Sequence, residues 1–268
     1  MIFHKLWCSR YNLILRTINF IFAKTIETFD LFLITEVSQN DRYRDVGLSR
    51  EKGLQKLDLL LKQEFGISYD ERNGMFSEHL ILLSAVSIMC PNIAHILEIG
   101  TYDGRTALLL SRLFPSANIK TIDLPSSEDS FKTSYGRCEM FDDFLINRNE
   151  TIRGAKNIQF EELNSLQLYN CDQCFDLIWI DGAHGYPTVA MDIINAVRLA
   201  EKGAFVLVDD LWTSVSQSDG MYKSIAGFES LTALVQAKVL REFVLFPKRL
   251  GGIFNSPRQK KYVGMFRV

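Results

Sequence analysis

The sequence has little net charge. Its 268 residues include 30 Lys and Arg against 32 Asp and Glu, a formal net charge of −2 at pH 7. No global field therefore selects a nucleic acid, and we expect no nucleic-acid partner. The hydrophobic share of 47% and the charged share of 23% are ordinary for a globular protein. This length suffices for one large α/β domain with an appendage.

Cysteine is scarce as well, and its five copies are odd in number. That count does not fit the disulfide framework of a small secreted protein and favours a reducing compartment. Long hydrophobic runs are absent too, because the longest stretch without a charged residue, from His79 to Leu97, is divided by Pro91. No secretory signal with a small-residue cleavage site is evident. We therefore expect a cytoplasmic protein without a transmembrane helix.

Residues 1–37 carry large apolar side chains at steps of three and four residues, and the charges up to Lys24 are all positive. This pattern predicts a long amphipathic helix or a broken pair of helices. Three placements remain open: a peripheral position on a membrane surface, packing on the same chain, or packing on a second subunit of a homo-oligomer. Ser38–Glu51 is polar and predicts a linker or loop. We accordingly divide the chain into a segment 1–50 and a domain 51–268.

The stretch Phe175–Asp210 predicts a strand, an amphipathic helix and a second strand. The runs Leu177–Ile180 and Ala204–Val208 are short, apolar and rich in β-branched residues, which favours buried parallel strands. The first run ends on Asp181, and the second ends on the pair Asp209-Asp210. Neighbouring strands lie roughly 5 Å apart. If these two are neighbours, three carboxylates share the carboxyl edge of the sheet, where open α/β sheets bind ligands.

The other elements alternate in the same way and predict an α/β fold. We expect a helix from about Leu54 to Phe65, and another at about 80–89 with Ser77 as its cap. Further strands are expected at 96–99, 118–124, 157–162, 241–246 and 261–268, with helices at about 106–113 and 222–238.

The motif Glu98-Ile-Gly-Thr-Tyr-Asp-Gly104 joins a predicted strand to the start of a helix. Its two glycines let the backbone approach a ligand closely and adopt positive φ. The motif is neither Gly-x-Gly-x-x-Gly nor a P-loop, so a pyrophosphate ligand is less expected than a nucleoside with a compact side chain. Asp123 ends the next strand, where a carboxylate can accept both hydroxyls of a ribose. A simple cap is the alternative role for Asp123.

Together, the glycine-rich motif, Asp123 and the strand that ends on Asp181 resemble class I S-adenosylmethionine-dependent methyltransferases over roughly residues 75–268. The resemblance implies a Rossmann-like, seven-stranded, mostly parallel sheet with helices on both faces and an antiparallel last strand. It also implies S-adenosylmethionine as cofactor. The implied cofactor-binding residues are Glu98, Gly100, Thr101, Tyr102 and Gly104 around the methionine part, Asp123 at the ribose, Asn164 and Ser165 at the adenine, and Asp181. Asn164 and Ser165 also fit plain turn chemistry.

The motif Asp181-Gly-Ala-His184 and the pair Asp209-Asp210 resemble a narrower group, the metal-dependent O-methyltransferases that act on sugar hydroxyls of macrolides and related natural products. This resemblance implies Mg²⁺ bound by Asp181, Asp209 and Asp210. The residue types agree, because an oxygen-rich site suits a hard divalent cation, and a cation relieves the repulsion between carboxylates. Capping of the following loop is the alternative role of the acidic pair.

The chemistry expected is methyl transfer from a sulfonium to a hydroxyl oxygen. A bound cation would stabilise the alkoxide, and His184, with Asp181 as the second catalytic residue, would take the proton. A helix cap or a hydrogen bond to a carbonyl is the other interpretation of His184. We thus expect an O-methyltransferase, assisted by magnesium, for a hydroxyl of a sugar or glycosylated small molecule. The alternatives are a hydroxylase-like or N-methyltransferase relative and a non-catalytic donor-binding scaffold.

Overall fold

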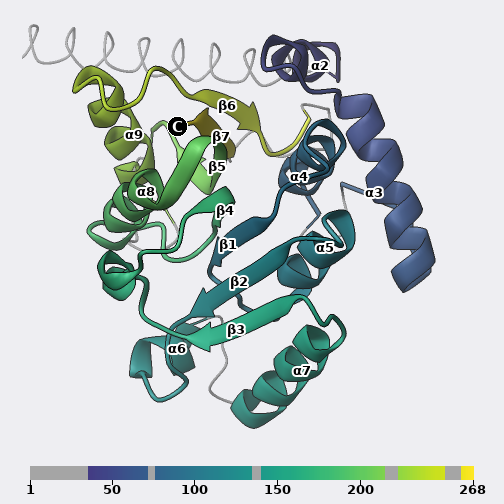
Figure 1. The fold of residues 1–268 in the computed structure, drawn as a ribbon, viewed down its shortest axis with the longest axis vertical. Coiled ribbons are helices and arrows are strands. Elements are labelled where there is room, and N and C mark those ends of the chain that lie inside the picture. The colour runs from purple at the N-terminus through teal and green to yellow at the C-terminus, as the bar shows by residue number, and fades with distance from the viewer. Residues whose placement is uncertain (1–35, 72–75, 135–139, 215–222, 251–260) are drawn as a thin grey trace, which may run out of the picture.

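The computed structural model describes residues 36–71, 76–134, 140–214, 223–250 and 261–268 (Figure 1). The predicted helix over 1–37 lies outside these ranges except for its last two residues. The helices are α2 (Glu36–Asp45), α3 (Arg50–Phe65), α4 (Glu78–Met89), α5 (Arg105–Leu113), α6 (Asp129–Thr133), α7 (Phe141–Arg153), the 3-10 helix η2 (Ser165–Asn170), α8 (Thr188–Leu199) and α9 (Ala226–Gln236). The strands are β1 (His95–Ile99), β2 (Asn118–Asp123), β3 (Ile158–Glu162), β4 (Phe175–Ile180), β5 (Ala200–Trp212), β6 (Val244–Pro247) and β7 (Lys261–Arg267). Within the described ranges, no helix is both long and apolar enough to cross a bilayer.

The seven strands form one sheet in the order β3-β2-β1-β4-β5-β7-β6. Strands β1 to β5 run parallel to one another, and β7 runs antiparallel to both β5 and β6. The expected Rossmann-like sheet with an antiparallel last strand is confirmed, and so is the pairing of β4 with β5. Because these two are neighbours, the acidic residues that follow them share one edge, as the sequence predicted.

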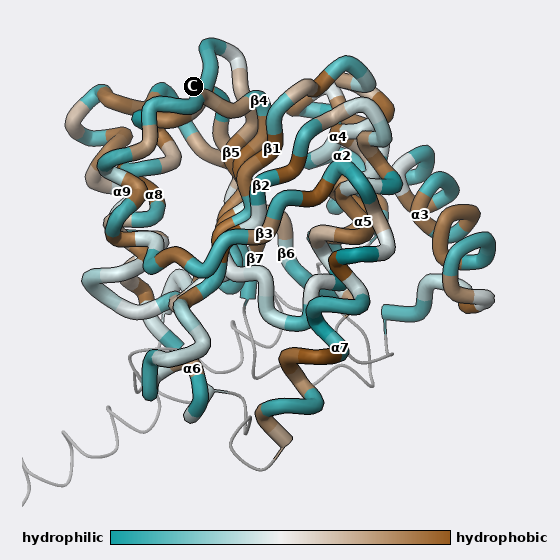
Figure 2. The backbone as a smooth tube through the Cα atoms, turned by 60° about the horizontal axis from the view of Figure 1, so that its bottom comes forward, coloured by the Kyte–Doolittle hydropathy of each residue, from teal (hydrophilic) through white to brown (hydrophobic). Residues whose placement is uncertain are grey.

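Helices cover both faces of the sheet. In Figure 1, α8 and α9 lie on one side, while α4 and α5 lie on the other with α3 outside them. The central strands are buried on both faces, so they read as continuous apolar runs (brown in Figure 2). Leu177 and Trp179 join the core beneath α3, α4 and α5. Ile178 and Ile180 point the opposite way and join the core beneath α8 and α9.

The linker predicted over Ser38–Glu51 is wrong, because most of it is helical. Helix α2 occupies Glu36–Asp45, and α3 begins at Arg50 with Ser49 as its cap. Helix α2 buries only a narrow stripe, Gln39 and Tyr43, so it lacks the apolar repeat that would have revealed it. The Gln39 amide donates a hydrogen bond of 2.7 Å to the Pro247 carbonyl in β6, which ties the helix to the sheet. The division of the chain at residue 50 stays a prediction.

A buried ion pair joins the first three described helices. Arg50 donates two hydrogen bonds to the Glu78 carboxylate, at 2.7 and 3.0 Å, and the Tyr43 hydroxyl donates a third at 2.8 Å. The side chains of Arg50 and Glu78 are 4% and 1% exposed. Since each charge is paired and hydrogen-bonded, this triad fixes α2 and α3 against the start of α4.

Candidate active site

A cavity of about 1020 Å³ follows the carboxyl edge of the sheet. Its lining combines most of the residues predicted for the two halves of the site: Gly100, Thr101, Tyr102, Asp123, Asn164, Ser165, Asp181, His184, Asp209 and Asp210. Glu98 and Gly104 do not line it. The structure therefore brings ten of the predicted residues to one cavity, large enough for a drug-sized ligand.

The glycine-rich turn passes directly over the end of β4. Gly100 has φ +102°, and a Cβ at this position would lie 2.3 Å from the Asp181 carbonyl oxygen, so no other residue fits the turn without moving the backbone. Gly104 has φ +80° and precedes α5, and a Cβ there would lie 2.9 Å from Ile152. Both glycines are therefore needed for backbone conformation and close packing.

Asp123 holds the same turn from the neighbouring strand. Its carboxylate accepts the Tyr102 backbone N–H at 2.8 Å and the Leu124 backbone N–H at 2.9 Å. The capping role left open for Asp123 is therefore present. The ribose contact that the sequence predicts for Asp123 stays a prediction.

The residues predicted at the adenine also serve their own loop. Asn164 accepts the Leu166 backbone N–H at 3.1 Å and so starts η2. Apolar side chains of Leu124, Leu163 and Leu166 line the cavity nearby and offer surfaces for a planar base. The Thr101 hydroxyl is engaged below the cavity, where it lies 2.6 Å from the Thr121 hydroxyl.

Glu98 is a buried carboxyl beneath the glycine-rich turn. Thr121 donates a hydrogen bond to its Oε2, while Oε1 is buried without a partner in the described part of the chain. Burial, and secondarily the charges of Asp123 and Asp103, raise the pKa of Glu98 to about 8 despite the Thr121 hydrogen bond. An acceptor oxygen without a donor fits the ammonium group of a methionine moiety, whose positive charge would favour the ionised carboxylate.

The raised pKa of Glu98 predicts two opposite pH dependences. The folded, ligand-free protein holds this proton more tightly than the unfolded chain, so its contribution to the free energy of unfolding is complete below about pH 4.5 and is lost as pH rises through about 8. Affinity for S-adenosylmethionine is expected to rise by up to about tenfold per pH unit as pH approaches 8 from below. Urea unfolding and calorimetric titration over this range measure both. Glu98→Gln should lack both slopes, and unchanged slopes in that variant would contradict the assignment.

The end of β5 is irregular, and this brings its two acidic residues to one place. The pairing of β5 with β7 shifts register between Val208 and Leu211, and Asp210 has φ +50°. Consecutive residues in a regular strand point to opposite faces. The bulge lets Asp209 and Asp210 contact the same lysine.

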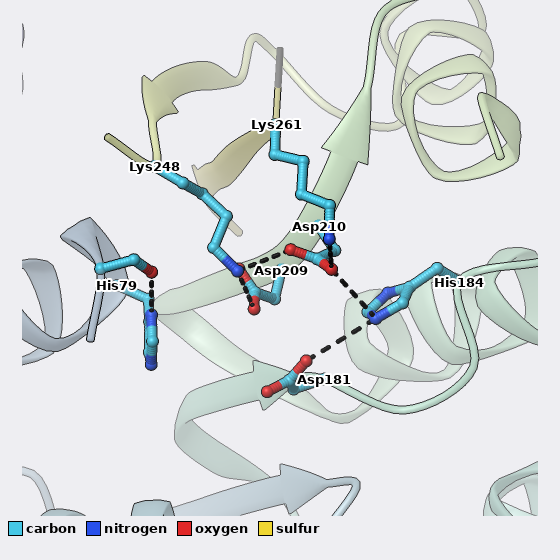
Figure 3. A network of polar contacts seen from close by, with 8 residues as sticks. His79, Asp181, His184, Asp209, Asp210, Lys248 and Lys261 are labelled. Atoms are coloured by element: carbon cyan, nitrogen blue, oxygen red, sulfur yellow. Dashed lines mark hydrogen bonds and ion pairs between the residues drawn. The ribbon is translucent and has the colours of Figure 1, made fainter. Parts of the chain in front are cut away.

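Two lysines pair with these carboxylates. Lys248 Nζ lies 2.7 Å from Asp209 Oδ2 and 2.6 Å from Asp210 Oδ1, and Lys261 binds Asp210 Oδ2 (Figure 3). Burial would lower the pKa of Lys248, but the two aspartates outweigh it and raise that pKa. Burial would likewise raise the pKa of Asp210, but Lys248, His184 and Lys261 hold it well below its usual value. Lys248 and Asp210 are therefore charged at neutral pH.

His184 lies between the ends of β4 and β5. Its Nε2 is 3.8 Å from Asp181 Oδ1 and 3.9 Å from Asp210 Oδ2 (Figure 3), and the residue is 6% exposed. Burial lowers its pKa, more than Asp210 raises it, so the imidazole is neutral at pH 7. Helix α8 begins at Thr188 after Pro187, so His184 is not its N-cap. Burial and Asp209 raise the pKa of Asp181, although 31% of its side chain is open to the cavity.

The carboxylates predicted as magnesium ligands do not fit that role as they stand. Within the described ranges, no group of three or more His, Cys, Asp or Glu residues is arranged to hold a metal ion. Three of the four oxygens of Asp209 and Asp210 contact ammonium groups, and a metal ion would need the same oxygens. The fourth oxygen, Asp209 Oδ1, is buried without a partner among the described residues. Magnesium binding by Asp181, Asp209 and Asp210 stays a prediction.

Three further residues of this site are not predicted from the sequence. Lys248 follows β6, Lys261 begins β7, and His79 lies in the first turn of α4, where its Nδ1 is 2.7 Å from the Ser77 hydroxyl and its ring stacks on Trp179 at 5.4 Å. Burial lowers the pKa of His79 to about 4, so it is neutral. The strand order was the available signal for the lysines. In that order, β6 ends and β7 begins at the carboxyl edge of β5.

Solved structures of methyltransferases are among the proteins that are similar to this chain. Two solved structures are each 17% identical to this chain. One is the N-methyltransferase NodS from Bradyrhizobium japonicum WM9 with S-adenosyl-L-homocysteine, which aligns over 81% of this chain and 98% of its own at a TM-score of 0.48. The other is the O-methyltransferase TomG from Streptomyces achromogenes, involved in tomaymycin synthesis and solved with S-adenosylmethionine. It aligns over 86% of this chain and 96% of its own at a TM-score of 0.43. Neither likeness assigns an acceptor to this chain.

The sequence itself matches one family model. A search of the curated proteins finds no match. Residues 97–211, less than half of the chain, match the family described as a methyltransferase domain. The narrower resemblance to its metal-dependent branch is not confirmed. Residues 97–211 are therefore similar to a methyltransferase domain, and this likeness covers that part of the chain alone.

Proposed function

We propose that the chain methylates a hydroxyl group of a sugar or glycosylated small molecule. The observation that carries the proposal is the neutral, buried His184 in the wall of the cavity, with two carboxylates just under 4 Å from its Nε2. A hydroxyl must lose its proton when it becomes an ether, and a neutral imidazole is suited to accept that proton. The density of polar groups along this half of the cavity supports a polyhydroxyl acceptor.

Different residues of the cavity bind the donor, take the hydroxyl proton and stabilise the charge that forms. Bound S-adenosylmethionine supplies a methyl group on a sulfonium sulfur, which keeps the C–S bonding pair as a thioether when the acceptor oxygen takes the methyl. His184 Nε2 takes the hydroxyl proton. Asp210, whose pKa is held low, stabilises the imidazolium that forms, since its Oδ2 lies 3.9 Å from Nε2, and the raised pKa of Asp181 makes its carboxyl the weaker of the two partners. The turn at Gly100 and the carboxylate of Asp123 hold the donor, so that two reactants meet in a fixed geometry.

Two measurements test this function. Titration calorimetry with S-adenosylmethionine is expected to show one site per chain. A panel of sugar and glycoside acceptors, incubated with methyl-labelled donor, should give a mass increase of one methyl group on a hydroxyl. Absence of donor binding would defeat every methyltransferase assignment. Donor binding with transfer only to amines would favour the N-methyltransferase alternative, and binding without any transfer would favour the scaffold. Added chelator decides whether the magnesium expected from the sequence takes part.

A further inference from the structure

Lys248 lies where a metal-dependent site would place its cation. Its ammonium nitrogen bridges Asp209 Oδ2 and Asp210 Oδ1 at 2.7 and 2.6 Å, and Lys261 holds the second oxygen of Asp210. A Mg²⁺ ion would approach the same oxygens at about 2.0–2.1 Å, so it and the ammonium exclude one another. The two negative charges of the pair are balanced by two positive charges from the same chain.

The lysine is fixed by its backbone as well as by its side chain. The Lys248 N–H donates to the Lys261 carbonyl at 3.0 Å, and its own carbonyl accepts the Glu78 N–H, the first of α4, at 3.0 Å. The preceding carbonyl, of Pro247, accepts the Gln39 amide. The Lys248 side chain is 15% exposed. Lys248 is therefore a preorganised charge of the site and not a surface lysine that has folded inwards.

One N–H donor of the Lys248 ammonium group remains available to a bound substrate. It has three N–H donors, of which the structure engages two with the aspartates. Lys248 also lines the cavity together with His184. A third N–H directed at the acceptor oxygen would stabilise negative charge as the proton leaves, the role that a divalent cation has in a metal-dependent enzyme.

We propose that the Lys248 ammonium takes the place of a divalent cation at this edge, so that methyl transfer needs no bound metal and Lys248 supplies the positive charge beside the acceptor oxygen. The part of this proposal that concerns catalysis rests on the methyl-transfer function proposed above. The part that concerns the cation site stands on the ion pairs alone, and the two parts are tested separately.

Titration with Mn²⁺, followed by the loss of its electron paramagnetic resonance signal, tests the cation site without any acceptor. The wild-type chain is expected to show no saturable binding at this edge. Lys248→Ala frees two carboxylates and should gain Mn²⁺ affinity by about tenfold or more, a gain that Asp209→Asn removes. The control Lys202→Ala deletes an exposed lysine near the other end of β5 and should leave Mn²⁺ binding unchanged. Lys248→Arg keeps the charge and should also bind no Mn²⁺.

Saturable Mn²⁺ binding by the wild-type chain that Asp209→Asn abolishes would overturn the proposal. The Mn²⁺ titration of the wild-type chain tests the proposal even if the Lys248→Ala variant fails to fold. In the activity assay, chelator should leave the wild-type rate unchanged, and Lys248→Ala should lower kcat by about 100-fold with the donor Kd within about twofold. Wild-type activity that chelator abolishes and Mg²⁺ restores would also overturn it. If no acceptor is methylated at all, the proposed function fails while the Mn²⁺ result still stands.

Discussion

Replacement of His184 by alanine is expected to lower kcat by about 10²–10⁴-fold, the usual contribution of a positioned general base. The donor dissociation constant should change by less than about twofold, because His184 lies at the acceptor half of the cavity and the glycine-rich turn forms the other half. Rates measured with labelled donor, and titration calorimetry on the same preparation, separate the two effects.

His184→Gln and the pH profile distinguish a base from a residue that only fills space. Glutamine preserves hydrogen bonding but takes no proton at neutral pH, so it should be as slow as alanine. Because burial lowers the pKa of His184, wild-type kcat should fall only below about pH 6.5, the ordinary pKa of histidine, and the variants should lack this limb. His95→Gln, at the opposite end of β1, is the matched control. More than a tenth of wild-type activity in either His184 variant would contradict the role.

Replacement of Arg50 by alanine is expected to lower the free energy of unfolding by about 3–5 kcal/mol, because it leaves the Glu78 carboxylate buried without its cation. Glu78 is 1% exposed at its side chain, and the Tyr43 hydroxyl alone would remain as a donor. Urea unfolding monitored by far-UV circular dichroism measures the loss. The same variant should reduce activity, because the Glu78 N–H is bonded to the backbone of Lys248.

Two further variants show that the effect belongs to the buried charge. Arg44, 73% exposed and paired with Asp41, should cost less than about 1 kcal/mol when changed to alanine. The double variant Arg50→Met with Glu78→Leu removes both charges and should recover much of the stability lost by Arg50→Ala. A loss below about 1 kcal/mol in Arg50→Ala would show that water reaches Glu78 and that the pair is dispensable.

The sheet and the position of the glycine-rich turn at its carboxyl edge could be predicted because their signals are local. Buried parallel strands are short apolar runs, and Glu98, Asp123 and Asp181 each lie in or directly after such a run. The glycine-rich turn is also visible in the sequence, because Gly100 and Gly104 stand at positions that have positive φ and therefore favour glycine. The helix expected from about Leu54 to Phe65 is part of α3, which begins earlier, at Arg50, and the helix expected at about 80–89 is α4, which begins at Glu78 directly after Ser77.

What the sequence could not show depends on contacts between distant residues. Helix α2 is stabilised by Tyr43 and Gln39 against α4 and β6, so its own pattern is weak. The acidic pair looked like an empty cation site because Lys248 and Lys261 lie 38 and 51 residues beyond Asp210. The composition includes these two lysines in the count of basic residues but does not show which acidic residues they pair with.

The placement of the charges at the cavity has a consequence for how far this chain can be shortened. Asp181, His184, Asp209 and Asp210 all lie within the matched segment 97–211, whereas Lys248, Lys261 and His79 lie outside it. A chain trimmed to that segment would keep every acid of the site and neither of their counter-ions. The segment that the family model covers therefore lacks the cations that pair with its own acidic residues, and its flanks supply them.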